Sequence, residues 1–130
     1  MQELTHYING AHVKGTSGRF ADVFNPATGE VQAQVPLASE AEMAHAVEVA
    51  AQAQPAWAAV NPQRRARVLM KFVDLLNRDM QKLAEALSRE HGKTVPDAKG
   101  DVQRGLEVVE YCIGAPHLLK GEYTDSAGPG

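Results

Sequence analysis

The chain has 130 residues, of which 44% are hydrophobic and 22% are charged, enough for one globular domain with a core. A formal net charge of −3 makes nucleic acid an unsuitable partner, and no apolar run approaches the ~20 residues of a membrane-spanning helix. The single cysteine, Cys112, excludes an intramolecular disulfide framework and favours a reducing, cytoplasmic location, and the N-terminus lacks the features of a secretory signal.

The N-terminal part is predicted to form a small antiparallel β arm. Asn9-Gly10 lies between two short strand-like runs, which is typical of a β-hairpin. A strand is predicted from Phe20 to Phe24, followed by a turn over residues 25–30 and a second strand from Val31 to Pro36. Such an arm is marginally stable alone and needs another element to pack against.

The first helix is predicted to follow the arm directly. Ser39 and Glu42 have the spacing of a capping box, in which each side chain bonds the backbone of the other residue. Apolar residues then recur at helical spacing to about Gln54. Pro55 is expected to end this helix, because proline lacks the N–H group that a helix interior needs.

The second helix is predicted to begin at Asn61-Pro62, a favourable N-cap followed by a favourable first residue. Its apolar stripe keeps helical spacing as far as Glu90. The polar run 77–79 interrupts the apolar residues and could divide the helix there, so the sequence leaves open whether this span is one helix or two.

A third helix is predicted to begin after Gly92, where a left-handed glycine suits a helix C-terminus. Thr94 is expected to cap this helix, with Pro96 in its first turn. One face of the helix is apolar and consists of Val102, Leu106, Val109 and Ile113. The opposite face is mixed and carries Arg104, Val108 and Tyr111. A helix of this kind is expected to make contacts on both sides.

These patterns predict an α+β chain that is mostly helical. We expect a β arm over residues 1–37, a helical portion over residues 38–121 and a flexible tail over residues 122–130, where glycine and proline accumulate.

Composition and spacing alone identify no catalytic residue. The five histidines show no metal-ligand spacing, and Gly92-Lys93-Thr94 lacks the upstream glycine of a P-loop because Leu87 takes its place. Cys112 lies near the apolar stripe of the third helix. It is predicted to be a small buried hydrophobic residue rather than a nucleophile.

The order of several motifs resembles the N-terminal portion of the aldehyde dehydrogenase superfamily. The matching pieces are Ile8-Asn9-Gly10, the run from Asn25 to Val31, Pro55-Ala56-Trp57, Arg64-Arg65 with the helix after it, and Glu90-His91-Gly92-Lys93. Within the superfamily, residues 100–110 are most similar to the CoA-acylating methylmalonate-semialdehyde dehydrogenase branch. The resemblance covers about residues 4–123.

The resemblance implies the first part of the α/β aldehyde dehydrogenase fold, namely the β arm and the first helices of its cofactor-binding domain. In that branch, malonate or methylmalonate semialdehyde is oxidised with NAD through a cysteine thioester, and coenzyme A takes the acyl group. The nucleophilic cysteine and the nucleotide-binding glycines of the family lie beyond the matching stretch. The 130-residue chain alone is therefore expected to be inactive and to bind neither NAD nor coenzyme A.

Arg104 is the substrate-binding residue that the resemblance implies. In the full-length enzyme it is expected to hold the distal carboxylate of the semialdehyde, because a guanidinium offers a bidentate fork to a carboxylate. The residues alone also allow a surface arginine that pairs with Glu107, with the carbonyl group of Val108 or with solvent.

Glu90 is the one metal-site residue that the resemblance implies. Together with the backbone around Val23 and Phe24, it is expected to lie near a monovalent cation. The residues alone also allow a surface acid at a helix end, or a hydrogen-bond acceptor for the preceding turn.

Two functions remain open from the sequence. The chain is either the N-terminal part of an acylating semialdehyde dehydrogenase or a stand-alone, non-catalytic helical interaction module derived from that family. A reading frame that continues past Gly130 into a glycine-rich βαβ unit would exclude the module. Self-association is expected in either case, because the helix over residues 102–113 is two-sided.

Overall fold

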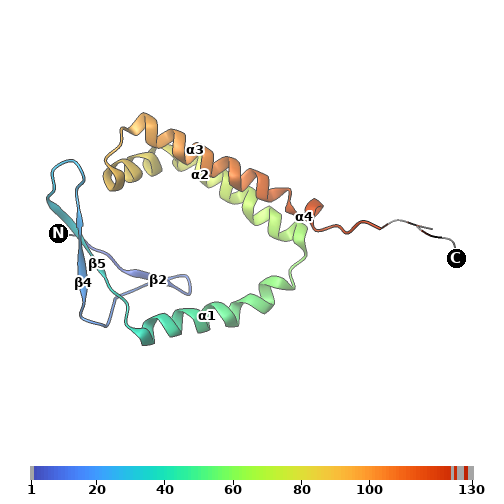
Figure 1. Cartoon of the computed structure of the whole chain (residues 1–130), viewed down its shortest axis with the longest axis horizontal. Coiled ribbons are helices and arrows are strands. Elements are labelled where there is room, and N and C mark those ends of the chain that lie inside the picture. The colour runs from blue at the N-terminus through green and yellow to red at the C-terminus, as the bar shows by residue number, and fades with distance from the viewer. Residues whose placement is uncertain (1, 124, 126–127, 129–130) are drawn as a thin grey trace.

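The computed structural model describes residues 2–123, 125 and 128. Its elements form an open ring, in which the β arm, the helix α1 and the antiparallel pair α2–α3 are the sides (Figure 1). This arrangement confirms a mostly helical chain with an N-terminal β arm. The tail predicted for residues 122–130 falls in large part outside the described residues.

The predicted hairpin is confirmed. Strand β2 (His6–Ile8) pairs in antiparallel fashion with β3 (Ala11–Val13). Between them Asn9 and Gly10 have φ angles of 55° and 75°. Two successive residues with positive φ are what a two-residue turn of type I′ requires, which explains why Asn-Gly stands there.

The rest of the arm is a second sheet with the strand order β1-β5-β4. Strand β4 (Phe20–Phe24) runs antiparallel to β5 (Val31–Pro36), as the sequence predicts. The sheet also has a short strand that the sequence did not reveal, β1 (Gln2–Glu3), which pairs in parallel with β5. Two residues are too few to show a periodicity of two.

Helix α1 spans Glu40–Ala58, and its capping box between Ser39 and Glu42 is present. The prediction that Pro55 ends the helix is wrong, since Pro55 lies inside it. The carbonyl groups of Pro55 and Trp57 still accept hydrogen bonds from the N–H groups of Ala59 and Val60. Proline removes only one bond here, and no residue of α1 is buried, so water is available to the carbonyl group left without that bond.

Helix α2 spans Pro62–His91 without a break, and the side chain of Asn61 caps its first turn. The polar run 77–79 therefore does not divide the span. The side-chain amide of Asn77 donates to the carbonyl group of Val73, at 3.1 Å, within the helix. Asparagine and aspartate have a slightly lower helix propensity than most residues. The packing of the apolar stripe of a long helix outweighs this small cost.

Helix α3 (Val95–Ile113) packs along α2 and is followed by the short α4 (Ala115–Leu118). Gly92 ends α2 with φ of 84°, and the hydroxyl group of Thr94 caps α3, both as predicted. The buried residues of the pair are mostly small, which lets the two helices approach closely: they are Ala66, Ala84, Ala98 and Leu106.

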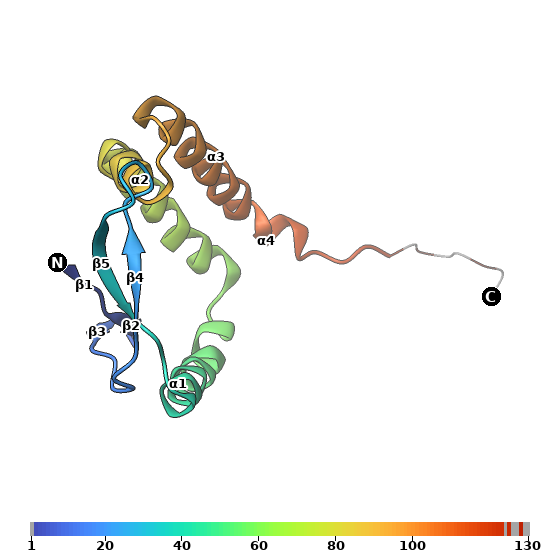
Figure 2. The same ribbon diagram turned by 60° about the vertical axis from the view of Figure 1, so that its left-hand side comes forward.

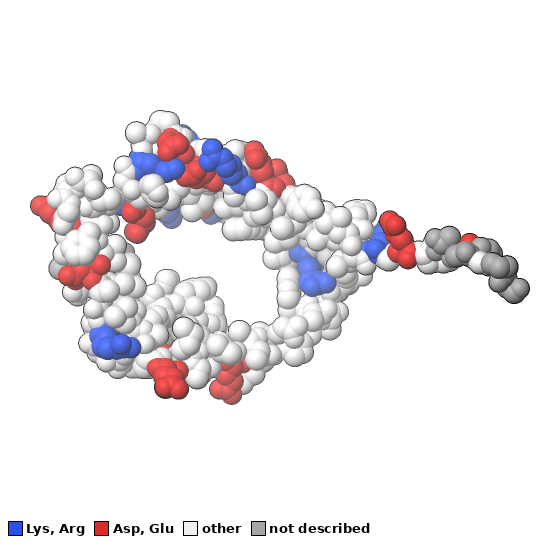
Figure 3. Space-filling model, viewed as in Figure 1, with Lys and Arg blue, Asp and Glu red and all other residues white. Residues whose placement is uncertain are grey.

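The remaining contacts close the ring. Figure 2 shows α1 leading away from the β arm to the start of α2, while the turn between β4 and β5 lies beside the end of α2. The side-chain amide of Gln32 reaches the carbonyl groups of Phe24 and Arg89, at 3.2 and 3.4 Å. The space-filling view shows an opening through the centre, with a rim made mostly of uncharged residues (Figure 3).

Among the described residues, no helix combines the length and the apolar character needed to cross a bilayer.

Candidate functional site

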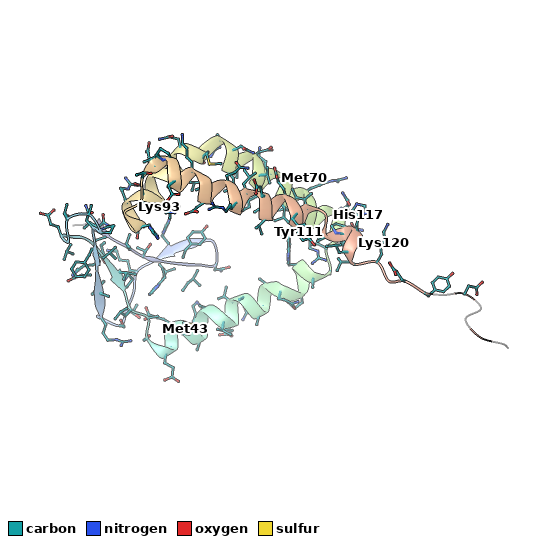
Figure 4. The ribbon with its side chains drawn as sticks, turned by 45° about the horizontal axis from the view of Figure 1, so that its top comes forward. Met43, Met70, Lys93, Tyr111, His117 and Lys120 are labelled. Atoms are coloured by element: carbon teal, nitrogen blue, oxygen red, sulfur yellow. The ribbon has the colours of Figure 1, made fainter. Side chains whose placement is uncertain are left out.

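Four charged residues gather where α2 meets α3, and we call them the junction cluster: Lys93, Asp97, Asp101 and Arg104. Lys93 lies in the turn between the helices, and the other three lie on α3. The spacings of four and three residues put Asp97, Asp101 and Arg104 on adjacent turns of one face of α3, and Lys93 precedes this face by four residues. Figure 4 places Lys93 at this junction and Tyr111 near the opposite end of α3.

The junction cluster is a chain of ion pairs. The ammonium group of Lys93 bonds Asp97 Oδ2, at 2.9 Å, and also bonds Asp101 Oδ2. The second oxygen of Asp101, Oδ1, accepts from Arg104 Nη1 at 2.6 Å. The Lys93 side chain is 17% exposed and that of Arg104 is 74% exposed. At one end of this row of ion pairs Lys93 is largely buried, and at the other end Arg104 faces solvent.

These contacts shift the pKa values of Lys93 and Asp101. Hydrogen bonds to Asp101 and then Asp97 raise the pKa of Lys93 above its ordinary value. The bond from Lys93, followed by the nearby charges of Lys93, Arg104 and His91, lowers the pKa of Asp101. Both shifts favour the charged forms of Lys93 and Asp101.

Arg104 lies on an open face of α3, with the exposed Val108 and Tyr111 on its later turns. Its partner is Asp101, rather than Glu107 or the carbonyl group of Val108. The sequence did carry a signal for this pair, since aspartate three residues before arginine is a favourable helical spacing. A Cβ atom added to Gly105 would meet no atom within 4 Å, so there is room beside Arg104. The substrate-binding role of Arg104 stays a prediction.

Cys112 is exposed, so the prediction that it is buried is wrong. It lines a groove of about 430 Å³, together with residues of α1, α2 and the segment after α3: Trp57, Pro62, Arg65, Leu69, Ala115, Pro116 and Leu119. Cys112 lies six residues beyond the buried Leu106. Six residues correspond to about 600° around a helix, which turns the thiol away from the buried stripe.

The region of the predicted cation site holds two carbonyl groups, those of Phe24 and Arg89. Both accept hydrogen bonds from the side-chain amide of Gln32. Glu90 is exposed next to this point. The monovalent-cation site at Glu90 stays a prediction.

Within the described part of the chain, no three residues among histidine, cysteine, aspartate and glutamate are grouped so as to hold a metal ion.

Comparison with known sequences gives a consistent set of relatives. The family model for the aldehyde dehydrogenase family matches residues 12–130. Malonate-semialdehyde dehydrogenase of Pseudomonas aeruginosa is 46% identical over 129 residues, which cover 99% of this chain and 26% of that protein. The enzyme of the same name from Listeria monocytogenes serotype 4b (strain F2365) is 45% identical, over 94% of this chain and 25% of that protein.

Comparison with solved structures agrees. A proposed methylmalonate-semialdehyde dehydrogenase of Sinorhizobium meliloti, complexed with NAD, is 67% identical, with a TM-score of 0.93. A methylmalonate-semialdehyde dehydrogenase of Oceanimonas doudoroffii is 44% identical, with a TM-score of 0.92. Each match covers 100% of this chain and 26% of the other. The chain therefore spans about a quarter of the length of these relatives.

Proposed function

Because the chain belongs to the aldehyde dehydrogenase family, we propose that it forms the N-terminal part of an NAD-dependent, CoA-acylating dehydrogenase for malonate or methylmalonate semialdehyde. The observation that carries the proposal is a match along nearly the whole chain to enzymes named for these substrates. We expect this part to comprise a β arm over residues 1–37 and a helical portion over residues 38–121. The single cysteine favours a cytoplasmic enzyme.

In the complete enzyme, NAD supplies a hydride acceptor and coenzyme A an acyl acceptor. The contribution of this segment is to bind and orient the substrate, and none of its residues is proposed as catalytic. Its only cysteine, Cys112, lies outside the nucleophile motif that the family resemblance implies, so we expect the isolated 130-residue chain to be inactive.

Arg104 is the residue proposed to recognise the substrate. A semialdehyde of this class carries a carboxylate at the end opposite the aldehyde. The exposed guanidinium group of Arg104 offers two parallel N–H donors to such a group and keeps its charge if water is excluded. The open space beside Gly105 lets a small acid approach closely.

The test compares Arg104→Leu and Arg104→Lys in the complete enzyme, assayed with malonate semialdehyde and with propanal, which has no carboxylate. We expect kcat/KM for malonate semialdehyde to fall about 10- to 100-fold in Arg104→Leu, because a hydrogen bond to a charged group is lost. Arg104→Lys keeps the charge without the fork and should lose less. The activity with propanal should be retained.

Arg78→Leu is the matched control, since Arg78 is also an exposed arginine paired with an aspartate, Asp79, at 2.6 Å. This control should leave both substrates unaffected. Equal losses for the two substrates in Arg104→Leu would show that Arg104 only supports the fold.

A further inference from the structure

We propose that Asp101 is a positioning residue, which holds Arg104 through Nη1 and thereby keeps its Nε–Nη2 edge directed at the substrate carboxylate. The inference rests on the function proposed for Arg104. It names the Asp101 carboxylate as the group that makes this exposed arginine a specific binding site.

The two oxygens of Asp101 have different partners. Oδ2 accepts from Lys93, and Oδ1 accepts from Arg104 at 2.6 Å. A carboxylate fixed at one oxygen presents the other in a defined direction. Asp101 therefore connects the half-buried Lys93 to the exposed Arg104, and the turn between α2 and α3 sets the position of the guanidinium group.

This connection addresses the main weakness of an exposed arginine as a binding group. A long side chain that is 74% exposed loses rotational freedom when it binds a ligand, and this loss weakens binding. An arginine already held by one nitrogen has lost part of that freedom before the substrate arrives. Positioning of this kind improves the binding of substrate and transition state alike.

The bond between Asp101 and Arg104 Nη1 leaves the Nε–Nη2 edge of the guanidinium group open. A guanidinium group has five N–H donors, and among the described residues Arg104 has a hydrogen-bonding partner at Nη1 alone. The Nε–Nη2 edge keeps two parallel donors, which match the two oxygens of a carboxylate. The charge of Asp101 does not repel an incoming anion strongly, because Lys93 lies against the same carboxylate.

The test uses Asp101→Ala and Asp101→Asn in the complete enzyme, with malonate semialdehyde and propanal as substrates. For Asp101→Ala we expect KM for malonate semialdehyde to rise about three- to tenfold, with kcat within twofold and KM for propanal unchanged. Asp101→Asn keeps an acceptor oxygen for Arg104 and should restore most of the lost affinity.

Asp79→Ala is the matched control, because Asp79 also pairs with a neighbouring exposed arginine, on α2. It should leave both KM values unchanged. In an Arg104→Leu background, Asp101→Ala should cause no further rise in KM, because no guanidinium group remains to be positioned. Thermal unfolding of each variant shows whether it folds.

Two outcomes would overturn the inference, and they can be told apart. If Arg104→Leu loses activity selectively with malonate semialdehyde but Asp101→Ala and Asp101→Asn behave like the parent enzyme, Asp101 does not position Arg104. The same holds if the Asp101 variants affect both substrates equally or remain additive with Arg104→Leu. If Arg104→Leu itself is unselective, the proposed function fails, and the positioning role fails with it.

Discussion

Glu42 is the residue with the largest change in acidity among the described groups. Its Oε2 accepts from the backbone N–H group of Ser39 at 2.8 Å, and its Oε1 accepts from that of Thr16 at 2.6 Å. These backbone bonds stabilise the ionised form and lower the pKa of Glu42 to about 2. One carboxylate thus caps α1 and fixes the loop of the β arm against it.

Glu42→Gln tests this role through the pH dependence of stability. The pKa is lower in the folded chain than its ordinary value of 4.5, so ionised Glu42 stabilises the fold above pH 4.5, and the effect is lost as the pH falls to about 2. Melting curves followed by circular dichroism should show a lower Tm for Glu42→Gln at pH 7 and equal Tm values near pH 2. Glu48→Gln, on the same helix, should match the parent at both pH values.

The sharp turn between α2 and α3 depends on Gly92, which ends the first helix and sets the direction of the chain towards the second. Its φ of 84° lies in the left-handed region, and a Cβ atom added there would come within 3.0–3.1 Å of the Pro26 side chain. The same glycine ends α2, starts the path to the junction cluster and lets the β arm touch the helices.

Gly92→Ala should destabilise the chain by about 1–2 kcal/mol, because an L-residue with a side chain is strained in the left-handed region. Pressure against Pro26 adds to this cost. Gly100→Ala is the matched control, since Gly100 lies within α3 and an added Cβ atom would meet nothing within 4 Å. Alanine there should raise stability, by up to ~1 kcal/mol. Urea unfolding would measure both, and equal effects would contradict the role of Gly92.

The elements with local causes were predictable from the sequence, whereas those set by distant contacts were not. The caps at Ser39, Asn61 and Thr94 were predicted correctly because each bonds a backbone group two or three residues away. The effect of Pro55 and the exposure of Cys112 were predicted wrongly, because both depend on what surrounds the helix. At the candidate site, Arg104 was identified only by family resemblance, and its partner Asp101 was missed.

At the scale of the whole molecule, a small core contrasts with a large apolar surface. Among the described residues, the buried hydrophobic ones are four alanines and Leu106. Many large apolar side chains are exposed instead, among them Phe72 at 45% and Val108 at 62%. Phe72 lines an apolar groove of about 400 Å³ between α2 and α3, together with Leu76, Leu83, Val102, Gly105, Leu106 and Val109. Surfaces of this kind are usually covered by other protein.

We expect the 130-residue chain to self-associate at micromolar concentrations through the groove between α2 and α3. Light scattering should show species larger than a monomer, and Phe72→Gln should shift the population towards the monomer. Met43→Gln, which removes a comparably exposed apolar side chain from α1, should have little effect. A dilute monomer that binds no hydrophobic dye would contradict the expectation.

Helix α1 has a mechanical role in this ring, because it joins the β arm to α2 while burying none of its own residues. A helix that serves as a spacer fixes an angle as well as a distance. Its 19 residues span about 28 Å, and each residue added or removed would turn everything beyond it by about 100°. The residue count of α1 is thus constrained, since the approach of Pro26 to Gly92 requires the two ends of the ring to meet at a set distance and angle.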